Sequence, residues 1–271
     1  MIGVFDSGYG GLTVLKPLME AMPEYDYLYL GDNARAPYGI RSAETVKKYS
    51  EEAVEFLFKR GAVLVITACN TVTASALRHL QKKYLLDKNV KDKKILGVIR
   101  PVVEKAAALT KNNKIGIVGT QSTVNSKAYE AELNHLNKNI KVFSKSCPLV
   151  VPLIEEHWHH KPEARMILKK YLRPLKSTNI DVLILGCTHY PLMYADFKTV
   201  IGKRTNVLKT GEIVADSLKD YLKRHAEIEK LLSKKGKREY LTTDSSEKFL
   251  EFANKELKLN IKEVKKVEIW Q

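Results

Sequence analysis

The stretches LVITACNT (residues 64–71) and LILGCTHYP (residues 183–191) decide the fold and direct the search for function. Each begins as a run of aliphatic residues and ends at a cysteine that is followed by polar side chains. Short apolar runs of this kind are typical of strands that are buried on both faces. The chain therefore contains two buried strands that end in the same way, each on a thiol.

Apolar runs and helical patterns alternate along the first part of the chain. This alternation predicts a mostly parallel sheet with helices on its faces. We expect strands at about residues 2–5, 27–31 and 63–67, and helices at about residues 13–22, 42–60 and 73–84.

The same order of strands restarts in the second part of the chain. It begins with KIGIVGT (residues 114–120), continues with VFSKSCPLVVP (142–152) and closes with DVLILGCTHYP (181–191). Gly116 follows Gly3 by 113 positions, and Cys187 follows Cys69 by 118 positions. Three matches at a nearly constant offset predict two similar halves.

The predicted architecture is α/β, with two similar, mostly parallel-sheet domains that face each other about a pseudo-twofold axis. We assign residues 1–94 and about 208–271 to the first domain, and residues 95–207 to the second. Helices expected at residues 214–225 and 246–257 would pack back on the first domain. Ligands of open parallel sheets bind beyond the carboxyl ends of the strands. The active site is therefore expected in the cleft between the domains, with one thiol on either side.

The composition indicates the cellular compartment and argues against several classes of protein. The 271 residues include three cysteines without a CxxC pair, which argues against a disulfide framework and a structural zinc site. The start MIGVF enters a strand without a signal-peptide pattern, and the apolar runs are too short to span a membrane. We expect a cytoplasmic protein with reduced thiols.

A formal charge of +15 raises the question of a nucleic-acid partner. The lysines, however, are spread along the chain and interleaved with glutamates, as in EKLLSKKGKREY (residues 229–240). This pattern favours a solvated surface, so that nucleic acid is unlikely as the primary partner.

The two strand-end cysteines have two interpretations. A buried cysteine often serves as a small hydrophobic residue. Here Cys69 precedes Asn70 and Cys187 precedes Thr188, and each pair opens a turn into a predicted helix, whose N-terminus would lower the thiol pKa. Two acid/base groups of one kind on opposite faces of a carbon suit stereoinversion, because one removes the α-proton while the other delivers a proton. We favour this interpretation.

Other polar residues accompany the thiols. Asp6 and Ser7 follow the first strand in DSGYGG, which lacks the GK[ST] of a phosphate-binding loop. Either Asp6 caps a helix in a glycine turn, or it assists proton transfer at Cys69 with Ser7 as a ligand donor. His189 would be the matching helper beside Cys187. Thr120, with Thr123, is the counterpart of Asp6 and Ser7 in the second half, as a ligand hydroxyl or a turn cap.

Two further candidates carry little weight. Cys147 precedes a proline and is expected to pack in the core. The cluster HWHH (residues 157–160) has no companion cysteine or carboxylate at ligand spacing, so that we expect a loop or helix end and no metal.

The combination of motifs resembles bacterial glutamate racemases, within the aspartate/glutamate racemase superfamily. The matching stretches are DSGYGG (residues 6–11), PYG (37–39), ACNT (68–71), GVIRP (97–101), CPLVVPLIEE (147–156) and GCTHYP (186–191). The resemblance implies cofactor-independent interconversion of L- and D-glutamate, supplying D-glutamate for peptidoglycan, by an enzyme that is commonly a homodimer.

The resemblance also implies roles for individual residues. Cys69 and Cys187 match the paired acid/base thiols, and Asp6 and His189 match their helpers. The positions that hold the polar groups of the substrate are matched by Ser7, Tyr38, Gly39, Asn70, Thr71 and Thr188. Alternatives are a racemase for aspartate or another amino acid and, from charge alone, a nucleic-acid-binding regulatory protein. Among these the CTH sequence favours glutamate, because similar aspartate enzymes more often carry Glu after Cys-Thr.

Overall fold

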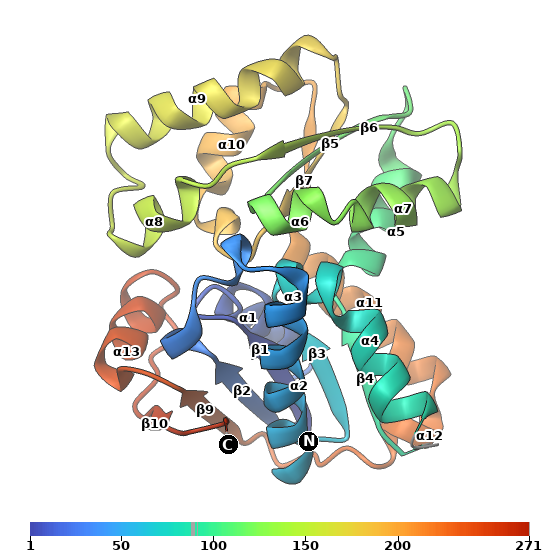
Figure 1. Cartoon of the computed structure of the whole chain (residues 1–271), viewed down its shortest axis with the longest axis vertical. Coiled ribbons are helices and arrows are strands. Elements are labelled where there is room, and N and C mark those ends of the chain that lie inside the picture. The colour runs from blue at the N-terminus through green and yellow to red at the C-terminus, as the bar shows by residue number, and fades with distance from the viewer. Residues whose placement is uncertain (88–89, 91, 271) are drawn as a thin grey trace.

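The computed structural model describes residues 1–87, 90 and 92–270, and it consists of two parallel sheets with helices packed around each. Figure 1 shows the first sheet below and the second above, with both chain ends at the bottom. The strand orders are β10-β9-β2-β1-β3-β4 and β6-β5-β7-β8. The order β2-β1-β3-β4 within the first sheet thus repeats as β6-β5-β7-β8 in the second, which confirms the two similar α/β halves.

Every strand pairing in the two sheets is parallel. The first sheet contains β1 (Ile2–Asp6), β2 (Tyr27–Gly31), β3 (Leu64–Thr67), β4 (Lys94–Gly97), β9 (Arg238–Thr242) and β10 (Lys265–Lys266). The second sheet contains β5 (Lys114–Gly119), β6 (Lys141–Ser146), β7 (Val182–Gly186) and β8 (Asn206–Val207). In both halves the strand that precedes a cysteine lies beside the first strand, so both cysteines emerge at the centre of a sheet edge.

The helices connect successive strands. Their bounds are α1 (Leu12–Ala21), α2 (Ala43–Lys59), α3 (Asn70–Ser75), α4 (Leu77–Gln81), α5 (Ile99–Leu109), α6 (Gln121–Asn125), α7 (Ala128–Leu136), α8 (Val150–Glu155), α9 (Pro162–Ser177), α10 (Tyr194–Ile201), α11 (Thr210–Arg224), α12 (Ala226–Glu229) and α13 (Ser246–Lys255). Short 3-10 turns span Asn33–Arg35, Tyr38–Ile40 and Tyr190–Met193, and a π-helical turn spans Lys82–Leu86.

Local sequence explains where α2 begins and ends. The Ser42 side chain accepts a 3.2 Å hydrogen bond from the backbone N–H of Thr45, which satisfies a donor at the helix start. Gly61 follows the helix with φ of +90°, a conformation that glycine adopts without strain. Val46, Ala53 and Leu57 are fully buried on one face.

The helix expected at residues 73–84 differs in the structure. It begins at Asn70, directly after Cys69, and is divided at Ala76, whose φ of −124° is not helical. The Thr73 hydroxyl donates a 2.8 Å bond to the carbonyl of Thr67, which ties the first turn back to the end of β3. Pattern and propensity do not reveal such a tertiary constraint.

The first sheet also extends further along the chain than expected. β4 pairs with β3 in the register Leu64↔Lys94, so that the first half continues to Gly97 instead of ending at residue 94. β4 is short and only one of its four residues is fully buried, which left a weak sequence signal. After β8 the chain returns from the second half to the first, where α11 packs against α1.

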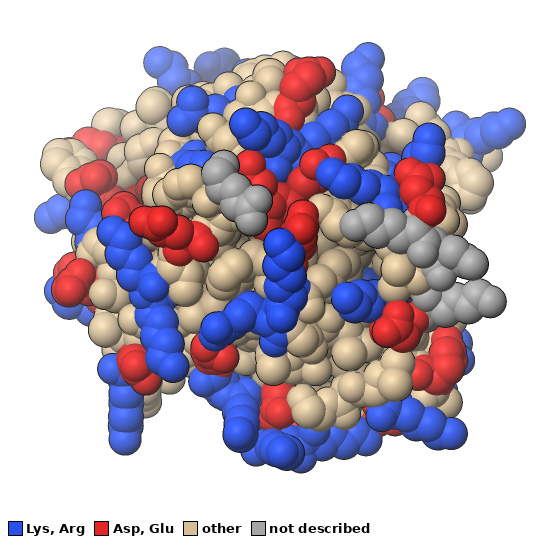
Figure 2. Space-filling model, turned by 60° about the horizontal axis from the view of Figure 1, so that its bottom comes forward, with Lys and Arg blue, Asp and Glu red and all other residues tan. Residues whose placement is uncertain are grey.

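The surface of the protein carries basic and acidic side chains side by side, as expected from the sequence. Figure 2 shows lysines and arginines scattered over the face in view, with acidic side chains between them. Within the described residues, none of the helices combines the length and apolar character that a membrane crossing requires.

Candidate active site

A cavity of about 260 Å³ lies where the carboxyl ends of β3 and β7 face each other. Its walls include all the site residues predicted from sequence except Asp6 and Thr123: Ser7, Tyr38, Gly39, Cys69, Asn70, Thr71, Thr120, Cys187, Thr188 and His189. A larger hollow of about 540 Å³, between α4, α5, α7 and α11, contains none of them. The predicted residues therefore converge on one cavity between the halves.

Cys69 is the thiol of the first half. It follows β3, precedes α3 directly, and is 5% exposed. Its Sγ lies 3.4 Å from Oγ of Ser7. Burial raises the pKa of Cys69 to about 12, and the charge of nearby Asp6 acts in the same direction. The expected lowering by a helix N-terminus was wrong for this thiol, because burial and a neighbouring carboxylate outweigh a helix of six residues.

Cys187 is the thiol of the second half, and its partner is His189. Cys187 follows β7, and both residues are buried. Nε2 of His189 lies 2.9 Å from Oε1 of Glu155, outside hydrogen-bonding geometry, so that the contact is electrostatic. Burial opposes charge on the imidazole, but contacts with Cys187 and Glu155 outweigh it and raise the pKa of His189 to about 10. The imidazole is therefore cationic at neutral pH.

Asp6 lies behind the cavity wall and is fully buried. One carboxylate oxygen accepts a 3.0 Å bond from the backbone N–H of Gly8, and the other accepts a 3.3 Å bond from the hydroxyl of Thr188. Burial raises the pKa of Asp6 to about 6, although the nearby charge of His189 works against this rise. Asp6 does not line the cavity, and its hydrogen bonds with cavity residues are those that it accepts from the Gly8 N–H and the Thr188 hydroxyl.

Two of the three glycines of DSGYGG, Gly10 and Gly11, leave no room for a side chain. A Cβ atom at Gly10 would lie 2.5 Å from both Nδ1 of His189 and Oγ1 of Thr188, inside van der Waals contact. The neighbouring backbone is held by Thr13, whose hydroxyl donates a 2.7 Å bond to the Thr188 carbonyl. The loop therefore needs a glycine to reach the second half and position His189.

Asn70 joins the two halves and offers a donor to the cavity. Its Oδ1 accepts a 2.6 Å hydrogen bond from the hydroxyl of Tyr129, in α7 of the second half. The amide nitrogen Nδ2 is buried and has no partner within the described chain. A buried donor without a partner costs free energy, which a carboxylate in the cavity would offset.

Three threonine hydroxyls meet at another wall of the cavity. Oγ1 of Thr71 lies 3.0 Å from Oγ1 of Thr120 and 3.2 Å from Oγ1 of Thr123. Thr120 also caps α6, since its side chain accepts a 3.3 Å bond from the Thr123 N–H. Both interpretations of Thr120 from the sequence, a cap and a cavity hydroxyl, are thus compatible with its position.

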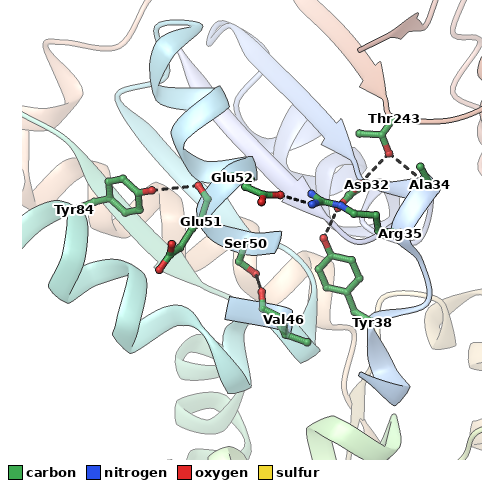
Figure 3. A network of polar contacts seen from close by, with 10 residues as sticks. All are labelled: Asp32, Ala34, Arg35, Tyr38, Val46, Ser50, Glu51, Glu52, Tyr84 and Thr243. Carbon is green, nitrogen blue, oxygen red and sulfur yellow. Dashed lines mark hydrogen bonds and ion pairs between the residues drawn. The ribbon is translucent and has the colours of Figure 1, made fainter. Parts of the chain in front are cut away.

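The loop that carries Tyr38 and Gly39 is anchored below the cavity. Figure 3 shows Asp32 between Arg35, Tyr38 and Thr243. The Tyr38 hydroxyl donates to Oδ2 of Asp32, while Nε of Arg35 and Oγ1 of Thr243 donate to the same carboxylate at 2.7 and 2.9 Å. The hydrogen of the Tyr38 hydroxyl is therefore engaged by Asp32 and cannot be donated to a ligand.

Sequence reasoning missed some residues of the site. Glu155 contacts His189 and Tyr129 holds Asn70. Glu155 lies in the stretch CPLVVPLIEE but was given no role, and Tyr129 lies in none of the quoted motifs. Cys147, expected to pack in the core, is fully buried and also lines the cavity. Burial raises the pKa of Cys147 to about 12, which keeps this third thiol protonated.

Known proteins share both sequence and fold with this chain. The sequence model of the Asp/Glu/Hydantoin racemase family matches residues 13–258. A glutamate racemase of Geobacter metallireducens is 38% identical over 254 residues, which cover 94% of this chain and 91% of the relative. The crystal structure of a glutamate racemase isoform from Bacillus anthracis has a TM-score of 0.90 at 34% identity, covering 99% of this chain and 97% of that one.

A second crystal structure, of the glutamate racemase from Francisella tularensis in complex with D-glutamate, gives a TM-score of 0.88 at 32% identity. It covers 99% of this chain and 97% of its own. The chain belongs to the Asp/Glu/Hydantoin racemase family. The resemblance to glutamate racemases predicted from the motifs is confirmed, and with it the enzyme class, an isomerase of the racemase type.

Proposed function

We propose that the protein interconverts L- and D-glutamate without a cofactor, with Cys69 and Cys187 as acid and base on opposite faces of the α-carbon. One observation carries the proposal. Each thiol ends a central strand of a different half, and both line the same cavity. Two groups of the same kind suit a reaction that runs equally in both directions, because reversal exchanges their roles.

The proton steps balance within one turnover. One thiolate takes the α-proton of the bound amino acid and becomes a thiol. The opposing thiol gives its proton to the other face of the carbon and becomes a thiolate. The protonation states of the two residues are therefore exchanged at the end of each turnover, and the reverse reaction restores them.

The electrostatics of the two sides differ, which gives each thiol its own helper. Beside Cys187, the cationic His189 provides the positive charge that a thiolate needs. On the other side the high pKa of Cys69 makes it the thiol that donates a proton. Ser7, at 3.4 Å from the Cys69 sulfur, and Asp6 behind it support the proton transfer when Cys69 acts as the base.

Neutral donors account for binding of the substrate carboxylates. Asn70, with its unpartnered Nδ2, and Thr71 and Thr120, with their hydroxyls, line the cavity, whereas the Thr188 hydroxyl already donates to Asp6. Donors fixed in a dry site stabilise charge that develops during α-proton removal more strongly than they would in water.

The biological role follows from the proposed reaction and from the resemblance to bacterial glutamate racemases. The product D-glutamate would be supplied for peptidoglycan, by a cytoplasmic enzyme that forms a homodimer. The support for these statements is the resemblance to the family.

The main alternative is the same reaction with aspartate as the substrate. The test compares the racemisation of glutamate with that of aspartate. The purified protein is incubated with L-glutamate and, separately, with L-aspartate, without added cofactor, while circular dichroism follows the loss of optical activity. We expect loss with glutamate and much slower loss with aspartate. Faster loss with aspartate would contradict the assignment of glutamate as the substrate. If a folded protein changed neither amino acid, the proposed reaction itself would be wrong.

A further inference from the structure

The histidine cluster HWHH meets a carboxylate that its sequence context does not contain. The cluster occupies the loop between α8 and α9, and Glu256 lies at the end of α13. Nε2 of His159 lies 3.2 Å from Oε2 of Glu256, and Nδ1 of His157 lies 2.7 Å from the other oxygen, Oε1. The fold thus places the carboxylate of Glu256 beside the histidines, whereas the sequence around them contained no carboxylate at ligand spacing.

The geometry of the cluster fits a small divalent metal ion. One ligand atom from each of His159, His160 and Glu256 can be chosen so that all lie within 4.8 Å of one another. Zinc bonds of about 2.0–2.2 Å at tetrahedral angles separate neighbouring ligand atoms by about 3.3 Å. The 3.2 Å between Nε2 of His159 and Oε2 of Glu256 matches this separation, and the centroid of the His160 ring lies 3.8 Å from that of the His159 ring, with the planes tilted by 44°.

Burial gives a second, independent reason for a ligand at this place. The His159 side chain is only 3% exposed and that of Glu256 only 11%. A carboxylate buried to this extent needs a positive partner, and a cation held between Nε2 of His159 and Oε2 of Glu256 would provide it.

We propose that His159, His160 and Glu256 bind a zinc ion, with a fourth position open to water. Two imidazoles and one carboxylate with an open position form a common zinc ligand set. His157 then orients the carboxylate through its contact with Oε1, as partners of metal ligands commonly do. The left-handed backbone of His157, with φ of 57°, turns the loop toward α13.

The ion joins the two halves of the molecule next to the cavity. Figure 1 shows α8, from the second half, directly above α13, from the first. The last residue of α8 is Glu155, which contacts His189, and Phe252 of α13 packs edge-on against the His189 ring at 6.0 Å. The zinc site therefore connects the two elements that flank His189.

The test uses the full chain, Zn²⁺ in calorimetric titration and Co²⁺ as a spectroscopic probe. His159→Ala, His160→Ala and Glu256→Gln each remove one ligand. His135→Ala, an exposed histidine on α7, is the matched control. We expect one Zn²⁺ per chain, binding weakened about tenfold or more in the three variants and unchanged in the control. Zn²⁺ should also raise the Tm of the wild type and of the control only.

The cavity thiols could bind metal as well, and the design separates the two sites. A thiol site would give Co²⁺ a sulfur charge-transfer band and would survive His160→Ala, whereas the proposed site has only nitrogen and oxygen ligands. His160 is exposed, so that its replacement tests the site without disturbing the core. Absence of zinc binding, or binding that all three variants retain, would overturn the proposal.

Discussion

The hydroxyl of Tyr129, in the second half, donates a 2.6 Å hydrogen bond to Oδ1 of Asn70, in the first. This bond fixes which way the Asn70 amide faces and leaves Nδ2, on a residue that lines the cavity, without a partner within the described chain. In the reaction that we propose, this contact between the halves orients a donor for the substrate.

Tyr129→Phe tests this relationship. Loss of one hydrogen bond costs about 1 kcal/mol, and the freed amide can turn its oxygen toward the substrate. We expect kcat/KM for glutamate to fall roughly 5- to 10-fold. Tyr194→Phe is the control, because it removes a hydroxyl that bonds to the Val207 carbonyl in the second sheet, away from the cavity. Equal activity of the two variants would contradict the role given to Asn70.

Glu155→Gln should change the pH dependence of the reaction. Glu155 is one of two contacts that raise the pKa of His189 to about 10. Without its charge that pKa falls, and the imidazolium is lost at a lower pH. The alkaline limb of the kcat profile should therefore move to lower pH, measured as initial rates between pH 6 and pH 11.

Glu156→Gln is the matched control for this change, since Glu156 is the exposed neighbour of Glu155. An alkaline limb that does not move in Glu155→Gln would show that the charge of His189 does not limit the reaction.

Asp6→Asn should alter how stability depends on pH. The pKa of Asp6 is about 6 in the fold and about 3.8 unfolded, so the fold holds the proton more tightly. The stability from this difference is complete below pH 3.8 and is lost as pH rises through 6, roughly 3 kcal/mol in all. Asparagine does not titrate, so the variant should lack this loss while its activity falls.

Urea unfolding of the wild type and Asp6→Asn, compared between pH 4 and pH 7, measures that difference directly. Contributions from other groups cancel in the comparison. Parallel stability curves for the two proteins would mean that the Asp6 pKa is not raised by burial.

Gly10→Ala should impair catalysis by moving His189. The added Cβ would lie 2.5 Å from Nδ1 of His189, so the imidazole or the loop must shift. We expect kcat to fall by at least about tenfold, because small misplacements of catalytic groups are costly. Gly8→Ala is the control in the same loop, since its Cβ would meet its nearest neighbour, Nδ2 of Asn33, at 3.5 Å, an ordinary contact. Equal losses in both variants would contradict the steric explanation.

Much of the fold could be predicted because its strands and helices have recognisable local patterns of apolar residues. The three apolar runs of each half, and the constant offset between them, gave the paired parallel sheets. β9 and β10 were not predicted, because they join the sheet beside β2, some two hundred residues earlier in the chain. Pairings of such sequence separation leave no periodic signal in the strand itself.

The residues of the site likewise fall into those that local sequence reveals and those that only the structure reveals. Cys69 and Cys187 could be recognised because polar residues follow each at the end of a buried strand. Glu155, Tyr129 and the pairing of Glu256 with the histidine loop depend on contacts between distant elements. The raised pKa of Cys69 also required the structure, since burial depends on all the surrounding side chains.

The central claim is that two thiols act on opposite faces of one carbon, and solvent deuterium tests it most directly. L-glutamate is incubated in D₂O, and at low conversion the two enantiomers are separated and their α-deuterium is measured by NMR. We predict that D-glutamate carries deuterium while the recovered L-glutamate retains protium, because the proton leaves to one thiol and the deuteron comes from the other. D-glutamate that retains the original proton, or L-glutamate that gains deuterium as fast as the product forms, would contradict the claim.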